Sequence, residues 1–295
     1  MSSPSDGAFT AWVEAVQGQA AELASLIETA AAPRLSSLEW YGIRVSDIAK
    51  SPQALLDSPY VHKVPVDSGY GFARFIYRDP LTDAVSGSGA TVWNLPGLTA
   101  TPWRDTSPAA QTLEAAADML IDEFERAQLS LQTHPDQTEV VSQGAWNAFF
   151  LSGPGQSPET RALGLEQTFA LVDSIDIPHN FGFAAYFRTR AGTTFRRHYG
   201  SSNLRLRQHM CLKIGDDTDA VIDVGGERRA WRLGECLVFD DSNPHQVFHV
   251  SGGERVILNV DSWHPDLTAG ERQVLSHPAF GKLGKVDVGP ADPLD

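Results

Sequence analysis

Short runs in which apolar and polar residues alternate fill the chain from Phe195 to Pro265. Gly, Asp, Asn, Ser or Pro residues separate the runs, which read LRLRQHMCLKI, AVIDV, RRAWRL, ECLVFDD and RVILNVDSW. A period of two with many β-branched and aromatic side chains predicts short β-strands. Because no helical pattern lies between them, the strands favour an antiparallel sandwich, jelly roll or barrel over a parallel sheet. We expect a double-stranded β-helix, the core of a jelly roll.

Apolar residues recur at three- and four-residue steps in other parts of the chain, and this spacing predicts helices. The first helix spans about residues 5–29. Two further helices follow Ser107-Pro108 and Ser157-Pro158, because serine caps a helix and proline suits its first position. The last of them runs towards Val172. We expect the last two to brace one sheet from outside, so the fold is mainly β with flanking helices.

The chain between the first helix and residue 90 has a mixed pattern. A short helix and two strand-like runs are expected there, at residues 46–56, 60–66 and 71–77. The Ser-Gly-Ser-Gly run at residues 86–89 is the best candidate for a domain boundary. After Pro265 the chain becomes polar and rich in Gly and Pro, which is typical of a loosely held end. The sequence therefore predicts an N-terminal helical and mixed region (residues 1–90), a double-stranded β-helix domain (residues 91–268) and a C-terminal tail (residues 269–295).

The composition is ordinary for a globular protein, with 42% hydrophobic and 20% charged residues. A formal net charge of −14 argues against nucleic acid or an anionic membrane as a partner, because both require clustered cations. Cys211 and Cys236 lie in apolar strand patterns, which favours buried reduced thiols over a disulfide. No leader pattern begins the sequence, and no uncharged apolar run reaches the roughly 18 residues of a membrane span. These features predict a cytoplasmic protein.

Two histidines follow the pattern of a metal site. His198 precedes one predicted strand and His245 follows a turn, so two loops at one mouth of a barrel can bring them together. Imidazoles suit Fe(II), and the common oxygenase site adds one carboxylate to two histidines. Here Gly200 stands where that carboxylate is expected. Ten residues after His245, Arg255 enters a strand, where a guanidinium is suited to a dicarboxylate. Two histidines and such an arginine point to 2-oxoglutarate.

Four other polar residues near this pair have simpler interpretations. His249 and His264 lie in QVFHV and DSWHP, at positions that indicate structural contacts. Asp240 and Asp241 are close enough to His245 to offer a metal carboxylate. However, Asp, Ser, Asn and Pro together predict a tight turn whose side chains bond the backbone, and we favour the turn.

Arg205 and Arg207 are two residues apart on one predicted strand, so both side chains face the same side. On an exposed face they would be a solvated charge pair. Beside a metal site, two inward-facing arginines need an anion. Trp231 and Trp263 are expected in the core, although Trp263 follows the strand of Arg255 and could line the pocket.

Three ordered blocks of the sequence carry a resemblance to a known family. HYGSSNLRLRQHMCL, LVFDDSNPHQVFH and ERVILNVDSWHPDLT resemble the conserved blocks of the aspartyl/asparaginyl β-hydroxylase family, and NLPGLTATPWRD and GAWNAFFL are similar to its catalytic domain. The resemblance covers roughly residues 91–268. It implies a cupin-like double-stranded β-helix that carries a non-haem Fe(II), 2-oxoglutarate-dependent dioxygenase site, with iron held by only two histidines.

The resemblance also implies roles for six residues. His198 and His245 match the iron ligands, Arg255 the arginine on the distal 2-oxoglutarate carboxylate, Arg207 with His209 the pair near its other end, and Arg205 a substrate-carboxylate contact. One departure concerns a serine that helps bind 2-oxoglutarate in the family's animal members. This chain has Phe187 at that position, eleven residues before His198.

The activity implied is hydroxylation of an aliphatic carbon in an amino-acid-like or short peptidyl carboxylate substrate. O₂ is consumed, and succinate and CO₂ are co-products. Two alternatives stay open. A 2-oxoglutarate-dependent halogenase also lacks the facial carboxylate, because its absence leaves room for chloride. A jelly roll can also bind a small carboxylate without catalysis.

Overall fold

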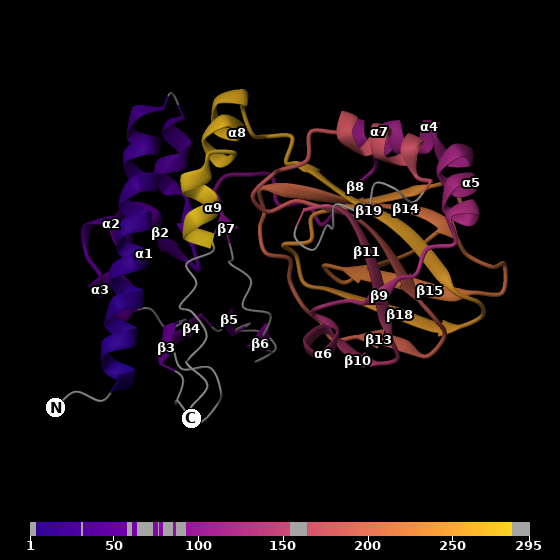
Figure 1. The fold of residues 1–295 in the computed structure, drawn as a ribbon, viewed down its shortest axis with the longest axis horizontal. Helices are drawn as coiled ribbons and strands as arrows, with labels where there is room; N and C mark the ends of the chain where they lie inside the picture. The colour runs from indigo at the N-terminus through magenta and orange to yellow at the C-terminus, as the bar shows by residue number, and fades with distance from the viewer. Residues whose placement is uncertain are drawn as a thin grey trace. The chain divides into compact units, whose positions relative to one another are not determined.

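A computed structural model describes residues 4–30, 32–57, 61–63, 73–75, 77–78, 85–86, 93–153 and 164–284 (Figure 1). The chain divides into two compact units. One comprises Met1–Leu98 and Leu267–Asp295, and the other comprises Thr99–Asp266. Among the described residues, no helix has the length and apolar character needed to cross a membrane.

Helices make up most of the first unit. They are α1 (Pro4–Thr29), the 3₁₀ helix η1 (Pro33–Ser37), α2 (Val45–Lys50), α3 (Gln53–Leu56), α8 (Ala269–Leu275) and α9 (Pro278–Gly284). The strands β1 (Glu39–Trp40), β2 (Ile43–Arg44) and β7 (Trp93–Asn94) form a sheet, and β3 (Val61–Lys63) pairs with β4 (Ala73–Phe75) and β5 (Tyr77–Arg78) with β6 (Val85–Ser86). On α1, Val16, Ala20 and Leu23 are fully buried, as their spacing predicts.

The predicted first helix is confirmed by α1. The helix predicted over residues 46–56 is instead two short helices, because Ser51 is extended and precedes Pro52, and a residue before proline is biased away from helix. Within the predicted strand-like runs, residues 61–63 and 73–75 are strands. The other residues of those runs mostly lie outside the described part of the chain, as do residues 87–89 of the Ser-Gly boundary.

Helices α8 and α9 lie in the segment for which the sequence predicted a tail. A capping box starts α8, in which Glu271 N–H donates to Thr268 Oγ1 at 3.2 Å and Thr268 N–H donates to the Glu271 carboxylate at 2.8 Å. Arg34 bonds the same carboxylate, and Phe280 stacks on Trp93 with ring centroids 4.0 Å apart. These contacts stabilise α8 and α9 where a loosely held tail was predicted. Residues 285–295 lie outside the described part, and the predicted domain boundaries stay a prediction.

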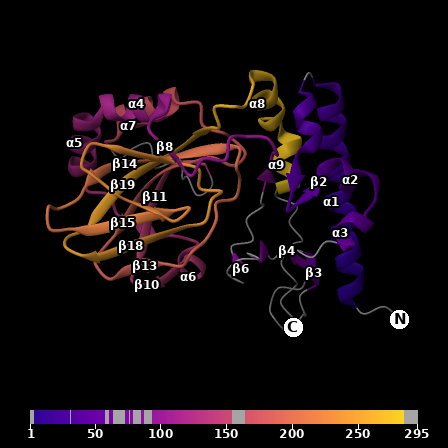
Figure 2. The ribbon, with the colours of Figure 1, turned by 180° about the vertical axis from the view of Figure 1, so that it is seen from behind.

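Two antiparallel sheets form the second unit. The first has the order β8-β17-β14-β19-β12-β11-β9, with β8 (Trp103–Arg104), β9 (Gln132–Thr133), β11 (Trp146–Ser152), β12 (Ala184–Thr189), β14 (Arg205–Lys213), β17 (Cys236–Phe239) and β19 (Arg255–Trp263). The second has the order β10-β13-β18-β15-β16, with β10 (Val141–Gln143), β13 (Thr193–Phe195), β15 (Asp219–Val224), β16 (Glu227–Ala230) and β18 (His245–Ser251). The fold is the predicted double-stranded β-helix (Figure 2). The five predicted runs all contain strands, namely β14, β15, β16, β17 and β19.

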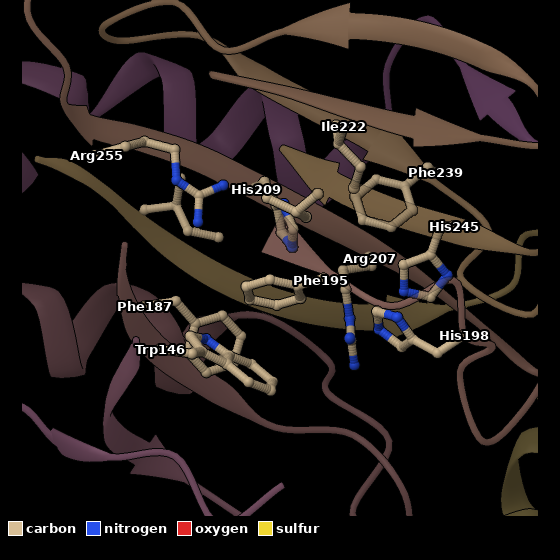
Figure 3. A pocket seen from close by; sticks show the side chains of 12 residues that line it. Trp146, Phe187, Phe195, His198, Arg207, His209, Ile222, Phe239, His245 and Arg255 are labelled. Carbon is tan, nitrogen blue, oxygen red and sulfur yellow. The ribbon is translucent and has the colours of Figure 1, made fainter. Parts of the chain in front are cut away.

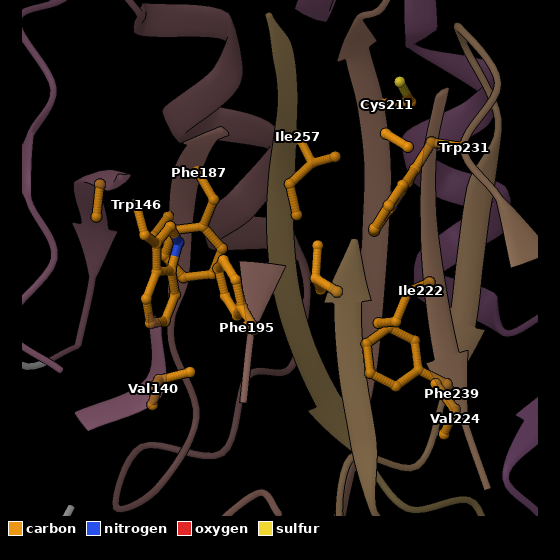
Figure 4. Packing of buried hydrophobic residues seen from close by; sticks show 14 of the residues in the cluster. Val140, Trp146, Phe187, Phe195, Cys211, Ile222, Val224, Trp231, Phe239 and Ile257 are labelled. Atoms are coloured by element: carbon orange, nitrogen blue, oxygen red, sulfur yellow. The ribbon is translucent and has the colours of Figure 1, made fainter. Parts of the chain in front are cut away.

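The inner faces of both sheets enclose one apolar core (Figure 4). Phe187 and Ile257 come from the seven-stranded sheet, and Ile222 and Val224 come from the five-stranded sheet. Inner-face positions follow a period of two along each strand. On β14 and β19 these inner positions also carry arginine, histidine and aspartate side chains, so polar groups are held inside the barrel.

Helices cover the outer face of the seven-stranded sheet. They are α4 (Pro108–Ala115), α5 (Ala117–Ala127) and α7 (Glu166–Ser174), and the short helix α6 (Gln137–Val140) precedes β10. Ala110 N–H donates to Ser107 Oγ at 3.0 Å, which confirms the predicted cap of α4. Of the helix predicted from Ser157 towards Val172, the part from Glu166 is confirmed by α7, which begins after Gly164 (φ +72°) and the non-helical Leu165. Residues 154–163, including the predicted Ser-Pro start, lie outside the described residues.

Candidate active site

The two histidines predicted as iron ligands meet in the second unit. His198 lies between β13 and β14, His245 begins β18, and the two form an isolated antiparallel bridge. The N–H of His198 donates to the carbonyl of His245 at 3.0 Å, and the reverse bond measures 2.9 Å. Their ring centroids are 4.1 Å apart. Backbone pairing therefore brings together two side chains that are far apart in the sequence.

Both imidazoles are held in the form that binds a metal. Nδ1 of His198 lies 2.8 Å from the carbonyl oxygen of Arg196, and Nδ1 of His245 lies 3.0 Å from that of Asn243. Because a carbonyl only accepts, each Nδ1 carries the hydrogen and each Nε2 keeps its lone pair. Burial lowers the pKa of His198 to about 3 and also lowers the pKa of His245, so both rings are neutral. Within the described residues, no group of three His, Cys, Asp or Glu side chains forms a metal cluster.

The space beside Gly200 is filled by the carboxylate of Asp241. A Cβ atom added to Gly200 would overlap this carboxylate, and Gly200 N–H donates to the backbone carbonyl of Asp241 at 2.6 Å. A side chain at residue 200 is therefore excluded while Asp241 keeps its position. In the described structure Asp241 Oδ1 is buried and has no hydrogen-bond partner. The carboxylate beside Gly200 therefore comes from Asp241, in the connection between β17 and β18, and not from residue 200 itself.

Two arginines of β14 form a buried network with two aspartates. Arg205 lies 3.0 Å from Asp241 and 3.1 Å from Asp261, and Arg207 lies 3.2 Å from Asp241 and 3.0 Å from Asp261. Burial alone would raise the pKa of Asp241, but the guanidinium groups of Arg205 and Arg207 hold that pKa well below its usual range. The anion that two inward-facing arginines need is therefore supplied by the protein itself.

The Asp240-Asp241 pair divides between two roles. Asp240 forms the predicted turn, since its Oδ1 accepts from Ser242 N–H at 3.0 Å and its carbonyl accepts from Asn243 N–H at 3.2 Å. For Asp241 the turn interpretation is wrong, because its carboxylate binds Arg205 and Arg207. From the sequence the two adjacent aspartates could not be told apart, because their different partners depend on the fold.

A pocket extends from the histidine pair into the barrel (Figure 3). His198, His245 and Arg207 lie at one end, Arg255 lies at the other, and His209 lies between them. The remaining walls are apolar and come from both sheets. They are formed by Trp146, Phe187, Phe195, Ile222, Phe239, Val247 and Ile257. The pocket thus has a polar group at each end and a hydrophobic middle.

Arg255 is a buried cation for which the described residues supply no anion. Its side chain packs over Trp231, with Cζ 4.0 Å from the ring centroid. Its Nε and Nη1 atoms are buried and have no hydrogen-bond partner among the described residues. Burial lowers the pKa of Arg255 to about 10, so the group is still charged at neutral pH. An unpaired buried charge is costly, and a bound carboxylate would offset this cost.

His209 lies on the pocket wall and packs edge-on against Phe239, with ring centroids 4.8 Å apart. Burial, together with the charges of Arg207 and Arg255, lowers the pKa of His209 well below its usual range. The ring is therefore neutral. Phe187 also lines the pocket, at the position where a serine was expected, so no hydroxyl reaches the pocket from this residue.

Asp261, which pairs with Arg205 and Arg207, was not singled out from the sequence. Asp261 lies six residues after Arg255 on β19, and an even spacing puts both side chains on the same face of the strand. This spacing could have predicted from the sequence that Asp261 faces the site. His249 bonds Thr189 Oγ1 through Nδ1 at 3.0 Å, and His264 Nδ1 accepts from Asp266 N–H at 3.2 Å. Both histidines make the structural contacts that were expected of them.

Comparison with known proteins identifies the family. A model of the aspartyl/asparaginyl beta-hydroxylase family matches residues 110–265. The chain belongs to this family. It is 34% identical over 197 residues to aspartate beta-hydroxylase domain-containing protein 2 of Homo sapiens, covering 62% of this chain and 53% of that protein. It is 32% identical over 203 residues to aspartyl/asparaginyl beta-hydroxylase of Mus musculus, covering 63% of this chain and 27% of that protein.

The chain therefore spans about half of the first relative and about a quarter of the second. Among solved structures, a Pseudomonas putida prolyl-4-hydroxylase matches with a TM-score of 0.32 and 16% identity, covering 55% of this chain and 92% of that one. A cupin 2 conserved barrel domain protein from Rhodopseudomonas palustris matches with a TM-score of 0.30 and 11% identity, covering 46% and 72%.

Proposed function

We propose that this member of the hydroxylase family is an Fe(II)- and 2-oxoglutarate-dependent dioxygenase that hydroxylates an aliphatic carbon of a carboxylate substrate. The observation that carries the proposal is Arg255, a buried guanidinium with unpartnered N–H groups at one end of a pocket. Two neutral imidazoles lie at the other end. A dicarboxylate that also chelates a metal matches both ends at once.

The residues fit Fe(II). His198 and His245 would hold the metal through Nε2, because each Nδ1 is tied to a backbone carbonyl. Two imidazoles leave positions open for 2-oxoglutarate and O₂. When bound, iron would let O₂ oxidise 2-oxoglutarate to succinate and CO₂ and also oxidise the substrate C–H bond to an alcohol, with one oxygen atom entering succinate and the other entering the product.

The chain's own residues orient the cosubstrate and keep water away from it. Arg255 would hold the distal carboxylate of 2-oxoglutarate by charge-assisted hydrogen bonds, and the aromatic ring of Trp231 keeps the guanidinium in place. The apolar walls suit the two methylene groups of 2-oxoglutarate. Arg207 and His209 would lie near its other carboxylate, with Arg207 itself fixed by Asp241 and Asp261.

For the prime substrate we propose an amino-acid-like or short peptidyl carboxylate. Arg205 stays a predicted substrate contact. It is only 3% exposed and already pairs with Asp241 and Asp261, so a substrate carboxylate would have to share or displace these partners. A cytoplasmic location and the lack of nucleic-acid or membrane partners likewise stay predictions.

The halogenase alternative is disfavoured by Asp241. A halide beside Gly200 would occupy space that the Asp241 carboxylate fills, and the two negative charges would repel each other. The non-catalytic alternative is disfavoured by the histidine pair, because a carboxylate carrier needs Arg255 but has no use for two imidazoles with free Nε2 atoms.

The proposal is tested by product analysis. Purified protein with Fe(II), 2-oxoglutarate and O₂ is given a panel of free amino acids and short acidic peptides, and succinate is measured by NMR while products are measured by mass spectrometry. We expect succinate and a product heavier by one oxygen atom, unchanged in chloride or bromide buffer. A chlorine isotope pattern that shifts to bromine's would establish the halogenase instead.

A further inference from the structure

Asn259 is a buried amide that satisfies none of its hydrogen-bonding capacity. It is fully buried on β19, and neither its Oδ1 nor its Nδ2 atom has a partner among the described residues. Arg255 and Ile257 precede it at steps of two on the same strand and line the pocket, and Asp261 follows it and binds Arg207. The period of two therefore puts the Asn259 amide on the inner face, just below the pocket wall.

His209 is the direct neighbour of Asn259 across the sheet. The two residues are register partners in the antiparallel pair of β14 and β19, so their side chains lie on the same face with Cβ atoms about 5 Å apart. His209 Nδ1 is also buried and has no partner in the described structure. Because the ring lines the pocket, its accessible edge is the one that carries Nε2.

Two adjacent buried polar groups without hydrogen-bond partners lower the free energy of unfolding, and no described neighbour supplies a partner. On the other side of Asn259 the register partner is Ala185, a small apolar residue. A leucine in place of Asn259 would fill similar volume without this cost. In the described structure the two side chains make no direct hydrogen bond, and at a Cβ separation of about 5 Å one internal water molecule can bridge them.

We propose that Asn259 is a positioning residue for the cosubstrate, which supplies His209 Nδ1 with a hydrogen-bond donor through one internal water molecule. A neutral imidazole carries one hydrogen, so a donor at Nδ1 leaves that hydrogen on Nε2. Nε2–H then faces the pocket and donates to the carboxylate of the oxo acid. The inference rests on the proposed function, because it assigns the ligand of His209 as 2-oxoglutarate.

The proposal predicts an order of affinities. Asn259→Leu removes the donor and leaves Nδ1 without a partner, which we expect to weaken 2-oxoglutarate binding about 10- to 100-fold. Asn259→Asp has nearly the same shape, but its negative charge favours a hydrogen on the nearer ring nitrogen, so the water accepts from Nδ1–H and donates to the new carboxylate. Nε2 then presents a lone pair to the carboxylate of 2-oxoglutarate. Asn259→Asp should therefore bind more weakly than Asn259→Leu. An amide that served only the fold would not produce this order.

The experiment measures binding of 2-oxoglutarate to Zn(II)-loaded protein by calorimetry, and reads the His209 tautomer from ¹⁵N-histidine NMR spectra. The His209 signal is assigned by its loss in His209→Gln. We expect the Nε2–H tautomer in the wild-type complex. The control is Gln208→Met, which removes a fully buried amide one residue away on the helix-covered face of β14 and should leave the affinity unchanged.

Each failure has its own outcome. Wild-type protein that does not bind 2-oxoglutarate would contradict the proposed function. Binding that is lost in Arg255→Met but normal in Asn259→Leu would overturn only the role of Asn259. The Nδ1–H tautomer in the wild-type complex would overturn it as well, and this result needs no variant to fold. An unfolding midpoint that falls in ligand-free Asn259→Leu, with unchanged affinity, would show that the amide serves the fold.

Discussion

The three arginines of the site differ in whether the protein itself supplies an acidic partner for each guanidinium. Arg205 and Arg207 are paired with aspartates, whereas Arg255 is buried and pairs with no anion in the part of the chain that the structure describes. The unpaired guanidinium therefore marks where a ligand's charge is required. Sequence position alone does not separate these three arginines, since each lies on an inner strand face.

The first residue-scale prediction concerns Arg255. Arg255→Met should weaken 2-oxoglutarate binding by about 2–5 kcal/mol, because a charge-assisted pair in a desolvated pocket is lost. The free energy of unfolding of the ligand-free protein should not fall, because the variant removes an unpaired buried charge. Calorimetry and urea unfolding measure the two effects. Arg188→Met, which changes the neighbouring strand outside the pocket lining, is the control. Unchanged affinity in Arg255→Met would exclude Arg255 as the carboxylate anchor.

A second residue-scale prediction concerns pH and Asp240. Burial raises the pKa of Asp240 from 3.8 to about 6, so the Asp240 carboxylate binds a proton more readily in the folded protein than in the unfolded chain. The resulting stability is fully present below the unfolded pKa of 3.8 and is lost as pH rises through about 6. Asp240→Asn should remove up to about 3 kcal/mol of this pH dependence. Urea unfolding at about pH 4 and about pH 8 measures it, and an identical pH dependence in both proteins would contradict the assignment.

At the scale of elements, the Arg-Asp network connects three parts of the barrel. Arg205 and Arg207 come from β14, Asp261 comes from β19, and Asp241 comes from the connection that leads to β18 and His245. The carboxylate of Asp241 also fixes Gly200 beside His198. The histidine pair is therefore held by ion pairs as well as by its own backbone bridge.

This arrangement predicts the effect of Arg205→Met. Loss of one guanidinium leaves Asp241 and Asp261 short of a partner in a buried site, which should lower the free energy of unfolding by about 3–5 kcal/mol. Arg228→Met removes an exposed arginine of β16 and should change it by less than about 1 kcal/mol. Chemical unfolding checks both values. If Arg205→Met kept its stability and lost only substrate affinity, Arg205 would act chiefly as the predicted substrate contact.

A further element-scale prediction concerns Gly200. Gly200→Ala places a methyl group where the Asp241 carboxylate lies, so either the carboxylate or the loop of His198 has to move. We expect weaker metal binding, measured as iron content after anaerobic dialysis. Gly253→Ala is the control, because an added Cβ there meets only Thr218 Oγ1 at 4.0 Å and the backbone, like that of Gly200, is outside the left-handed region. Equal iron content in wild type and Gly200→Ala would contradict the steric argument.

The elements were predictable from the sequence wherever the apolar period was strong. The strands from β14 to β19 and the helix α1 follow directly from alternation and from three- and four-residue spacing. The helices α8 and α9 were missed because Gly and Pro nearby suggested a tail, whereas Thr268 and Glu271 form a capping box that the composition does not reveal.

At the site, the sequence predicted which residues face the inside of the barrel, but it did not predict which residue each of them contacts. Pairing across strands depends on register, which put Asp261 beside Arg207 and Asn259 beside His209.

At the scale of the whole molecule, the predicted site residues all lie in the unit formed by Thr99–Asp266. The family match at residues 110–265 covers the same part of the chain. The unit holds a histidine pair and an unpaired arginine at opposite ends of one pocket, and this separation is the basis of the proposed cosubstrate. A single ligand that bridges the two ends is the central claim.

That claim is tested most directly by anaerobic absorption spectroscopy. Protein mixed with Fe(II) and 2-oxoglutarate in the absence of O₂ should develop the weak visible charge-transfer band of a chelated oxo acid. The band should be absent in His198→Ala and His245→Ala, and in Arg255→Met it should require a much higher 2-oxoglutarate concentration. No band in the wild-type protein, together with a measured lack of bound iron, would contradict the account and favour a jelly roll that binds a carboxylate without catalysis.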